Sequence, residues 1–338
     1  MHARSLPLLL VLALVATDGH AQDAGVDAGA TIAPAPAPED TSSGPLHVVT
    51  GVYLNQIISI DLKMNQFTAD FWMWFRWRGG PSDYNPLDSF DIINARINSR
   101  ATTERRTLPD GTEYAEIRLN ATITRQWELE RYPFDDHELQ IAIEDATLED
   151  HRLVFDPDVD NSDVDPDLSV SGWRIGEHHM TVATRVYHSN YGDTSLPTGS
   201  ESSYSRVLFT VDLHREGLAR FFKVFFGIFV ATLVSWAAFL FRPKDAGSRV
   251  GVSIGALFAA AASSIAINAQ LPEVNGITLA DTIVFICLTA ILIGLVLSIV
   301  SLRLADATDA LLAHRVNRIA TIAFPLAVIG AILLAVHG

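Results

Sequence analysis

Residues 219–241 read ARFFKVFFGIFVATLVSWAAFLF, and this stretch decides the fold because so long an apolar run predicts a helix that crosses a membrane. Similar runs follow at residues 249–270, 278–302 and 316–336. Each has about the 20 residues that a helix needs to span a bilayer. The chain of 338 residues is therefore predicted to end in a transmembrane domain, residues 216–338, of four helices.

The orientation of these helices follows from the basic residues around them. Residues 271–277, between the second and third stretches, contain no Lys or Arg, and Glu273 lies among them. The basic residues near the membrane lie after the first stretch and around the link from the third to the fourth: Arg242, Lys244, Arg249, Arg303, Arg315 and Arg318. Because Lys and Arg are enriched in cytoplasmic loops, the N-terminal half is expected outside the cytoplasm.

Composition excludes several classes of protein. The net charge is −15, from 39 acidic and 24 basic residues, and the acidic excess lies before Arg215. An electrostatic nucleic-acid binder is therefore not expected. The single cysteine, Cys287, excludes an intramolecular disulfide and a zinc ribbon.

The N-terminus has the pattern of a secretory signal. Residues 1–21 contain Arg4, an apolar run over residues 6–16, and the small residues Gly19 and Ala21 at the predicted cleavage site. A membrane anchor is the alternative, but the apolar run is too short to span a bilayer. Residues 22–45 are rich in Ala, Gly and Pro and are predicted to be a disordered linker.

Residues 46–215 have the pattern of an all-β domain. Between Phe67 and Trp77, apolar residues alternate with a second set that includes Asp70 and Arg76. Turn residues separate several such runs, which suits a β-sandwich. The predicted fold class is an immunoglobulin-like all-β sandwich followed by a four-helix transmembrane domain.

The second apolar stretch is unusually rich in small residues, since residues 250–270 read VGVSIGALFAAAASSIAINAQ. Close helix packing explains small residues, and for this helix alone it is the favoured interpretation. The alternative is a helix that lines a water path, in which hydrophobic rings close by dewetting. A pore would need a closed ring of identical subunits. One helical face would then line it: Ser248, Gly251, Gly255, Phe258, Ala262, Ile265 and Ala269.

Several motifs occur together in residues 46–338, in this order: TGVYL (50–54), Trp72 and Trp77, YPFD (132–135), GW (172–173), Arg215, SWAAF (235–239), Arg249, LP (271–272), RIA (318–320) and AFP (323–325). In this order and spacing the chain resembles the bacterial branch of the pentameric ligand-gated ion channels, the Cys-loop receptor family. It departs from the family pattern at Arg125 and Leu139, where the two family cysteines would fall. Gly227 stands where the first membrane helix usually has proline.

The resemblance implies a junction that couples the β domain to the pore. Its YPFD loop, called the signature loop below (residues 131–136), would lie at the base of the sandwich. Asp135 would then lie near Arg215 and form a partly buried ion pair, although two solvated surface charges are the alternative. The residues expected to couple ligand binding to gating are Asp61, Lys63, Pro133, Phe134, Asp135, Arg215, Pro272 and Glu273.

The resemblance also implies an agonist site between subunits. The candidate ligand-binding residues are Trp72, Phe90, Tyr187, Tyr191 and Tyr204. Aromatic faces bind cations, although strand packing explains the same residues. Residues 143–150 offer carboxylates and no aromatic ring, so an amine, protons and a divalent ion all remain open as agonists.

Acidic and histidine residues give two further hypotheses. A possible calcium site is expected at Asp156, Asp158, Asp160 and Asp163, with a solvated acidic loop as the favoured alternative. His137 is interpreted as a surface residue. His214, beside Arg215, is a candidate pH sensor because imidazole changes charge near neutral pH.

Together these observations predict a homopentameric ligand-gated ion channel, not an enzyme, in a bacterial inner membrane. The N-terminal domain would be periplasmic, and the partners would be four identical subunits, the lipid bilayer, permeant ions and a small agonist or protons. No cofactor is expected beyond the possible modulatory Ca²⁺. An acidic vestibule would concentrate cations, which favours cation selectivity. The alternative is a non-conducting, membrane-anchored ligand-binding receptor.

Overall fold

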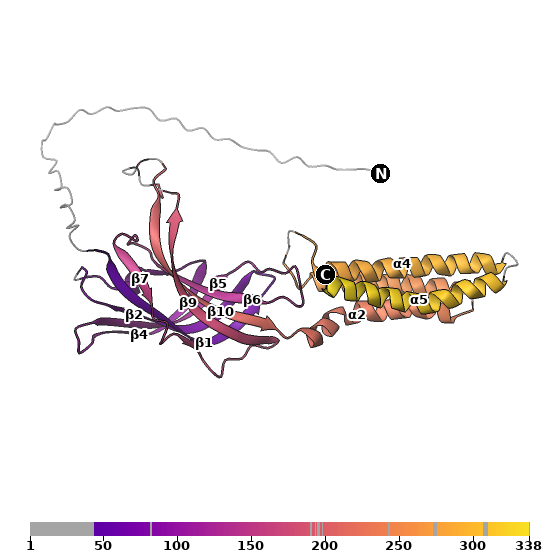
Figure 1. Ribbon diagram of the computed structural model, residues 1–338, viewed down its shortest axis with the longest axis horizontal. Helices are drawn as coiled ribbons and strands as arrows, with labels where there is room; N and C mark the ends of the chain where they lie inside the picture. Colours follow the sequence, from indigo (N-terminus) through magenta and orange to yellow (C-terminus); the bar gives the residue numbers. More distant parts are fainter. Residues whose placement is uncertain are drawn as a thin grey trace, which may run out of the picture. The chain divides into compact units, whose positions relative to one another are not determined.

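The computed structural model describes residues 44–337, except 82, 190, 193, 195, 196, 198, 243, 273–275 and 307–309. The predicted signal peptide, nearly all of the predicted linker, and Glu273 lie outside the described residues. Strands occupy the chain up to Arg215, and long helices follow from Gly217 (Figure 1). The change from strand to helix thus falls where the apolar pattern predicts it.

The β domain consists of two sheets. The strands are β1 (Leu46–Asp61), β2 (Gln66–Trp77), β3 (Phe90–Ile92), β4 (Ala95–Thr107), β5 (Glu113–Thr124), β6 (His137–Asp145), β7 (Leu153–Pro157), β8 (Asp163–Val164), β9 (Trp173–Tyr187) and β10 (Ser202–Arg215). One sheet has the order β4-β5-β2-β1-β7, with β8 also paired to β1, and the other has the order β3-β6-β10-β9. The short helix α1 (Pro86–Ser89) leads into β3.

Alternation along β2 builds the core between the sheets. Every second residue from Phe67 to Trp77 is buried on one face, while the residues that alternate with them are half-buried on the other. The Phe75 ring lies 6.2 Å from that of Phe90 in the opposite sheet. The predicted sandwich is confirmed because the period of two places each aromatic side chain on the facing sheet.

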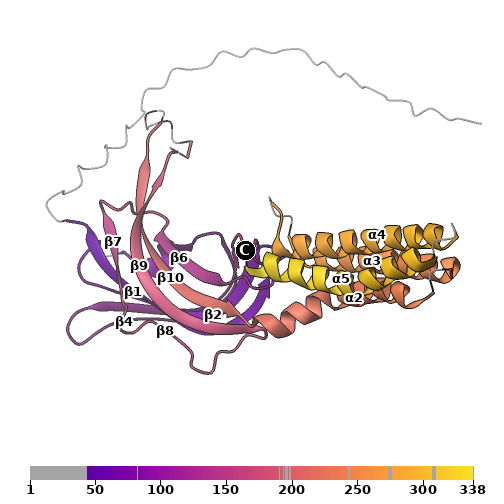
Figure 2. The same cartoon turned by 45° about the vertical axis from the view of Figure 1, so that its right-hand side comes forward.

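Four helices are long and apolar enough to cross a membrane. They are α2 (Gly217–Ala237), which continues into the 3-10 helix η1 (Ala238–Leu240), α3 (Ala246–Asn268), α4 (Leu279–Asp306) and α5 (Ala310–His337). All four predicted stretches are helical, and α3 packs along α2 and α4 (Figure 2). The last helix begins at Ala310 rather than 316, since residues 310–315 continue the helical turn.

Where α2 meets α5, a tryptophan of α2 supplies a hydrogen bond that a proline removes from α5. Pro325 lies inside α5 and has no N–H to donate to the carbonyl four residues earlier. That carbonyl belongs to Thr321, and the indole N–H of Trp236 donates to it at 2.9 Å. The backbone group that proline frees is therefore satisfied by a neighbouring helix, as a membrane interior requires.

Gly227 allows α2 and α3 to approach closely. A Cβ at this position would lie 2.6 Å from the hydroxyl oxygen of Ser263. Small residues at helix crossings permit such approach in membranes. The glycine that replaces the family proline thus has a packing role in this chain.

Candidate functional site

The signature loop is joined to the first membrane helix by a buried ion pair. The Arg215 Nη2 atom donates to the Asp135 Oδ2 atom at 2.7 Å, and the two side chains are 1% and 3% exposed. Burial alone would raise the pKa of the Asp135 carboxyl, but a hydrogen bond from His137 and the Arg215 charge together lower that pKa. Burial lowers the pKa of Arg215 and Asp135 opposes this. The predicted pair is present, and Asp135 is a carboxylate in it.

Aromatic rings complete the surroundings of this pair. The Arg215 guanidinium lies over the Trp173 ring, 4.0 Å from its centroid, and 5.2 Å from that of Tyr132. Cation–π contacts of this kind stabilise a desolvated arginine by about 2 kcal/mol. The guanidinium is therefore held both by its counter-ion and by ring faces.

Phe134 carries the signature loop onto the start of α2. Its ring stacks on Phe221 with centroids 5.3 Å apart. Gly217 makes room for it, since a Cβ there would lie 2.8 Å from the Phe134 ring. Nearby, the backbone N–H of Leu279, at the start of α4, donates to the Glu130 carbonyl at 2.8 Å. The loop and the residue just before it thus contact two membrane helices.

The structure shows that His137 is buried, so its interpretation as a surface residue is wrong. Its side chain is 3% exposed, and Nε2 lies 2.6 Å from Asp135 Oδ2. The ring lies between Trp127 and Trp173, with centroid distances of 5.1 and 5.3 Å. Strand alternation could have revealed this position, because His137 shares the core face of β6 with Leu139 and other buried residues.

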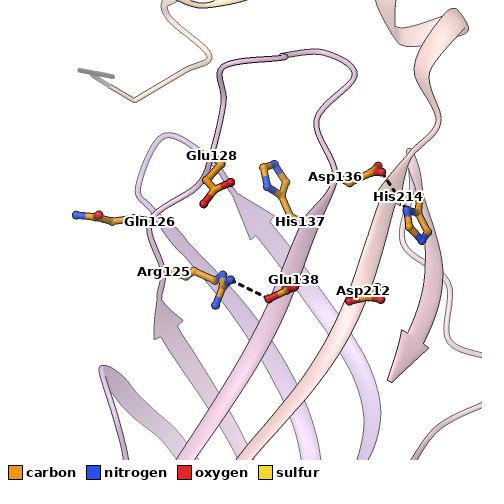
Figure 3. Close-up of a pocket in the computed structure, with 8 residues that line it drawn as sticks. All are labelled: Arg125, Gln126, Glu128, Asp136, His137, Glu138, Asp212 and His214. Carbon is orange, nitrogen blue, oxygen red and sulfur yellow. Dashed lines mark ion pairs between the residues drawn. The ribbon is translucent and has the colours of Figure 1, made fainter. Parts of the chain in front are cut away.

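A cavity of about 350 Å³ lies beside this junction. Figure 3 shows the residues that line it: Arg125, Gln126, Glu128, Asp136, His137, Glu138, Asp212 and His214. His214 is 40% exposed and pairs with Asp136 at 3.1 Å, while Arg125 lies 3.6 Å from Glu138. The two histidines of the cavity therefore differ, one buried against Asp135 and the other partly solvated.

The other predicted coupling residues have separate environments. Asp61 accepts a hydrogen bond from the Met64 N–H at 3.0 Å and so shapes the β1–β2 turn. Lys63 is exposed, Pro133 is buried in the signature loop, and Pro272 is half-buried after α3. Their part in gating stays a prediction.

The predicted pore face of α3 is exposed along its whole length in the single chain. Phe258 and Ile265 are each 72% exposed. The remaining predicted pore residues are also exposed: Ser248, Gly251, Gly255, Ala262 and Ala269. The opposite face is buried against the other helices through small side chains that include Ser253, Ala256 and Ala260. One side of α3 therefore packs against the other helices, and its opposite side is exposed in the single chain.

Arg249, at the inner end of α3, is turned into the subunit. Only 1% of this residue is exposed. Its Nη2 donates to the Asn317 amide oxygen on α5 at 2.6 Å, and its Nη1 lies 3.4 Å from the Ser301 hydroxyl on α4. Arg249 thus lies away from the exposed face of α3.

Tyrosines cluster where β9 and β10 pair. The ring of Tyr187 lies 5.8 Å from Tyr204, edge to face, and 6.3 Å from Tyr191. The Tyr187 hydroxyl lies 3.0 Å from a Glu144 oxygen, and Arg206 donates to both. Sequence reasoning missed this buried Glu144–Arg206 pair. The cluster thus presents tyrosine rings beside a carboxylate that is paired with an arginine.

Two predicted ligand residues lie apart from these tyrosines. Trp72 projects from the outer face of β2 into a separate cavity of about 440 Å³, near Arg118. Phe90 is only 7% exposed and packs on Phe75, so it belongs to the sandwich core. The prediction that Phe90 lines a ligand site is not borne out.

The acidic loop does not form the expected calcium site. Asp158 is buried and accepts from Trp74, Arg76 and Asn161, which occupy both of its oxygens. The other carboxylates of the predicted site, Asp156, Asp160 and Asp163, do not join it. Within the part of the chain that the structure describes, no three His, Cys, Asp or Glu side chains could hold a metal ion together. Asp158 thus has a structural role instead.

Comparison with known proteins finds relatives that are named as ion channels or as receptor subunits. No protein-family model matches the chain. A proton-gated ion channel from Gloeobacter violaceus is 23% identical over 308 residues, which cover 86% of this chain and 82% of that protein. The gamma-aminobutyric acid receptor subunit rho-1 of Homo sapiens is 24% identical over 178 residues, 52% of this chain and 35% of that subunit. The pH-sensitive chloride channel 2 of Drosophila melanogaster is 23% identical over 181 residues, 53% of this chain and 34% of that channel.

The fold and these comparisons define a class first. The chain is a multi-pass membrane protein with an extracellular N-terminal β domain followed by four membrane-spanning helices. The relatives named above are members of the pentameric ligand-gated ion channel family, the Cys-loop receptors, which are channels rather than enzymes, and the chain is similar to them at low identity.

Proposed function

We propose that this chain forms a homopentamer in a bacterial inner membrane and conducts ions through a pore lined by α3. The observation that carries the proposal is the free face of α3, on which every predicted pore position is exposed while the opposite face is packed. Five such faces around an axis would enclose a water path, with Phe258 and Ile265 as hydrophobic rings.

Cysteine accessibility in the reconstituted full-length protein tests the pore. Cys287 is the single cysteine, so a Cys287→Ser background has no competing thiol. Phe258→Cys and Ile265→Cys should then lose current when a water-soluble thiol reagent is applied during activation. Ala260→Cys, on the packed face, is the matched control and should be unaffected. Equal insensitivity of all three variants would refute a pore on this face.

The agonist would bind between β domains, with Tyr187 and Tyr204 of one subunit facing Trp72 of the next. Their ring faces suit a cationic group. Tyr204→Ala should raise the agonist concentration for half-maximal current, whereas Phe90→Leu, a change in the core, should leave it unchanged in pentamers that assemble. Saturable binding without current under any stimulus would instead favour the non-conducting receptor.

For the permeant ion, the proposal is a cation. Its support is the acidic outer domain together with the burial of Arg249, which keeps the charge of that residue away from the exposed face of α3. A chloride-selective pore is the alternative, since one relative is named a chloride channel. Reversal potentials measured while Na⁺ or Cl⁻ is replaced decide between them.

Protons are proposed as modulators of gating. Two relatives are named as proton-gated and pH-sensitive channels. In this chain, histidines lie within the coupling junction and at the cavity beside it. Currents recorded between pH 8 and pH 5 test this modulation, and a current that does not change across this range would contradict it.

A further inference from the structure

His137 lies at the centre of the coupling junction. Both His137 and Arg215 bond to the same oxygen of Asp135, Oδ2, at 2.6 and 2.7 Å. The other oxygen, Oδ1, is buried and has no hydrogen-bond partner among the described residues. Two donors therefore share one acceptor, while a second acceptor on the same carboxylate stays free.

The hydrogen bond fixes the protonation of the ring. Asp135 is a carboxylate, because its hydrogen bond from His137 and the Arg215 charge outweigh burial and lower its pKa. A carboxylate only accepts hydrogen bonds, so His137 Nε2 carries a proton. Its Nδ1 then has a lone pair, and no partner for Nδ1 occurs in the described part of the chain. His137 also lines the cavity of about 350 Å³ (Figure 3), which offers a route for water.

We propose that His137 is a proton-binding site that regulates gating. In this scheme Nδ1 takes up one proton from water in the cavity, and the ring becomes an imidazolium. The imidazolium keeps Asp135 Oδ2, and Arg215 shifts toward the free Oδ1. This inference rests on the proposed channel function and assigns its proton sensitivity to one residue.

The charges around His137 come from several elements. The charged groups at the junction and its cavity are Asp135, Asp136 and Glu138 near the His137 strand, Glu128 and Arg125 from the segment after β5, and Asp212, His214 and Arg215 from β10. The carboxylates favour the imidazolium, and so do the flanking rings of Trp127 and Trp173. Burial and the Arg215 charge oppose it.

A displaced Arg215 has a direct route to the membrane helices. It lies two residues before Gly217, where α2 begins and where Phe134 packs. Its guanidinium also stacks on Trp173, which contacts the His137 ring. A change in the His137 charge would thus alter the electrostatic environment of Arg215, the residue that joins β10 to α2.

The test uses the full-length pentamer and a His137→Gln variant. Glutamine keeps a donor for Asp135 but does not titrate. His214→Gln is the matched control, because His214 lines the same cavity yet lies on a partly exposed, separate ion pair. Two readouts are followed from pH 8 to pH 5: channel current, and the fluorescence of the tryptophans, two of which touch the His137 ring.

Wild type and His214→Gln should show the same fluorescence transition, and His137→Gln should lose it. The pH-dependent change in current should also shrink by about threefold or more in His137→Gln. A His137→Gln variant that keeps both wild-type responses would overturn the proposal while leaving the channel function intact. A transition that depends on His137 without any current would instead contradict the channel function.

A second variant covers the case in which His137→Gln does not assemble. Glu128→Gln combined with Asp212→Asn leaves His137 in place and removes two negative charges from the cavity lining. The fluorescence transition should then move to lower pH, because fewer carboxylates favour the imidazolium. An unchanged midpoint in assembled pentamers would overturn the proposal.

Discussion

Replacing Asp135 with Asn should strongly destabilise the pentamer. The substitution keeps the shape of the side chain and removes its charge. Arg215, which is 1% exposed, then stays buried without its counter-ion. Breaking a buried pair by removing one partner costs about 3–5 kcal/mol. The stacking of Arg215 on Trp173 at 4.0 Å survives the change, so we expect about 3 kcal/mol per subunit.

This magnitude predicts a measurable shift in the apparent melting temperature. One kcal/mol lowers the melting temperature of a domain of this size by about 2–4 °C, so the expected loss is about 10 °C. The assay is thermal melting of the detergent-solubilised pentamer, followed by size exclusion with fluorescence detection. Asp136→Asn is the matched control. Its side chain is 61% exposed, and it should cost about 1 kcal/mol or less.

A double variant separates charge from packing. Asp135→Leu with Arg215→Met removes both charges, and replacing a buried pair by apolar residues is often close to neutral. It should therefore melt nearer to wild type than Asp135→Asn does. The reasoning would be refuted if Asp135→Asn melted within about 2 °C of wild type, or if the exposed Asp136→Asn cost as much.

Three further predictions concern the same structure. Gly227→Ala should lower the melting temperature, because the new Cβ would lie 2.6 Å from the Ser263 hydroxyl oxygen. Adding Ser263→Ala should restore the melting temperature, since the nearest Ser263 atom left is the Cβ at 3.4 Å. A double variant that melts no higher than Gly227→Ala would contradict this packing. Trp236→Phe should cost about 1–3 kcal/mol by leaving the carbonyl freed by Pro325 unsatisfied, and Pro325→Ala should rescue it in a thermal melt. Folding lowers the pKa of Asp135, so its contribution to folding stability is complete above the ordinary carboxyl pKa of about 3.9. That contribution is lost as the pH falls through the lower pKa of the folded state. The melting temperature of wild type should therefore fall more steeply with decreasing pH than that of Asp135→Asn.

Most of the fold can be predicted from two features of the sequence: the alternation of apolar residues along strands and the length of the apolar stretches. Alternation identified the buried face of β2, and apolar length identified four helices within a few residues. The Asp135–Arg215 pair could also be anticipated from the family motif. Its partial burial was part of that expectation, but its contact with the Trp173 ring was not, because Trp173 is far from Asp135 along the chain.

Failures of the sequence reasoning share a physical cause. The carboxylates around Asp158 match a calcium loop in spacing, but Trp74 and Arg76 on β2 already bond to the Asp158 carboxylate. Phe90 is aromatic and near the expected ligand loops, but the facing sheet covers it. In each case a side chain distant in sequence decides the outcome, and a local pattern does not reveal which side chain that is.

The two ends of α3 are held in different ways, and this bears on how a gate could open. At the inner end, Arg249 ties α3 to α4 and α5 through Ser301 and Asn317, so a displacement there would break bonds to a buried cation. At the outer end, the described contacts reach the β domain through the start of α4, where Leu279 bonds to Glu130. Because the inner end is anchored in this way, we expect activation to move the half of α3 that carries Phe258 and Ile265 more than the half that begins at Arg249.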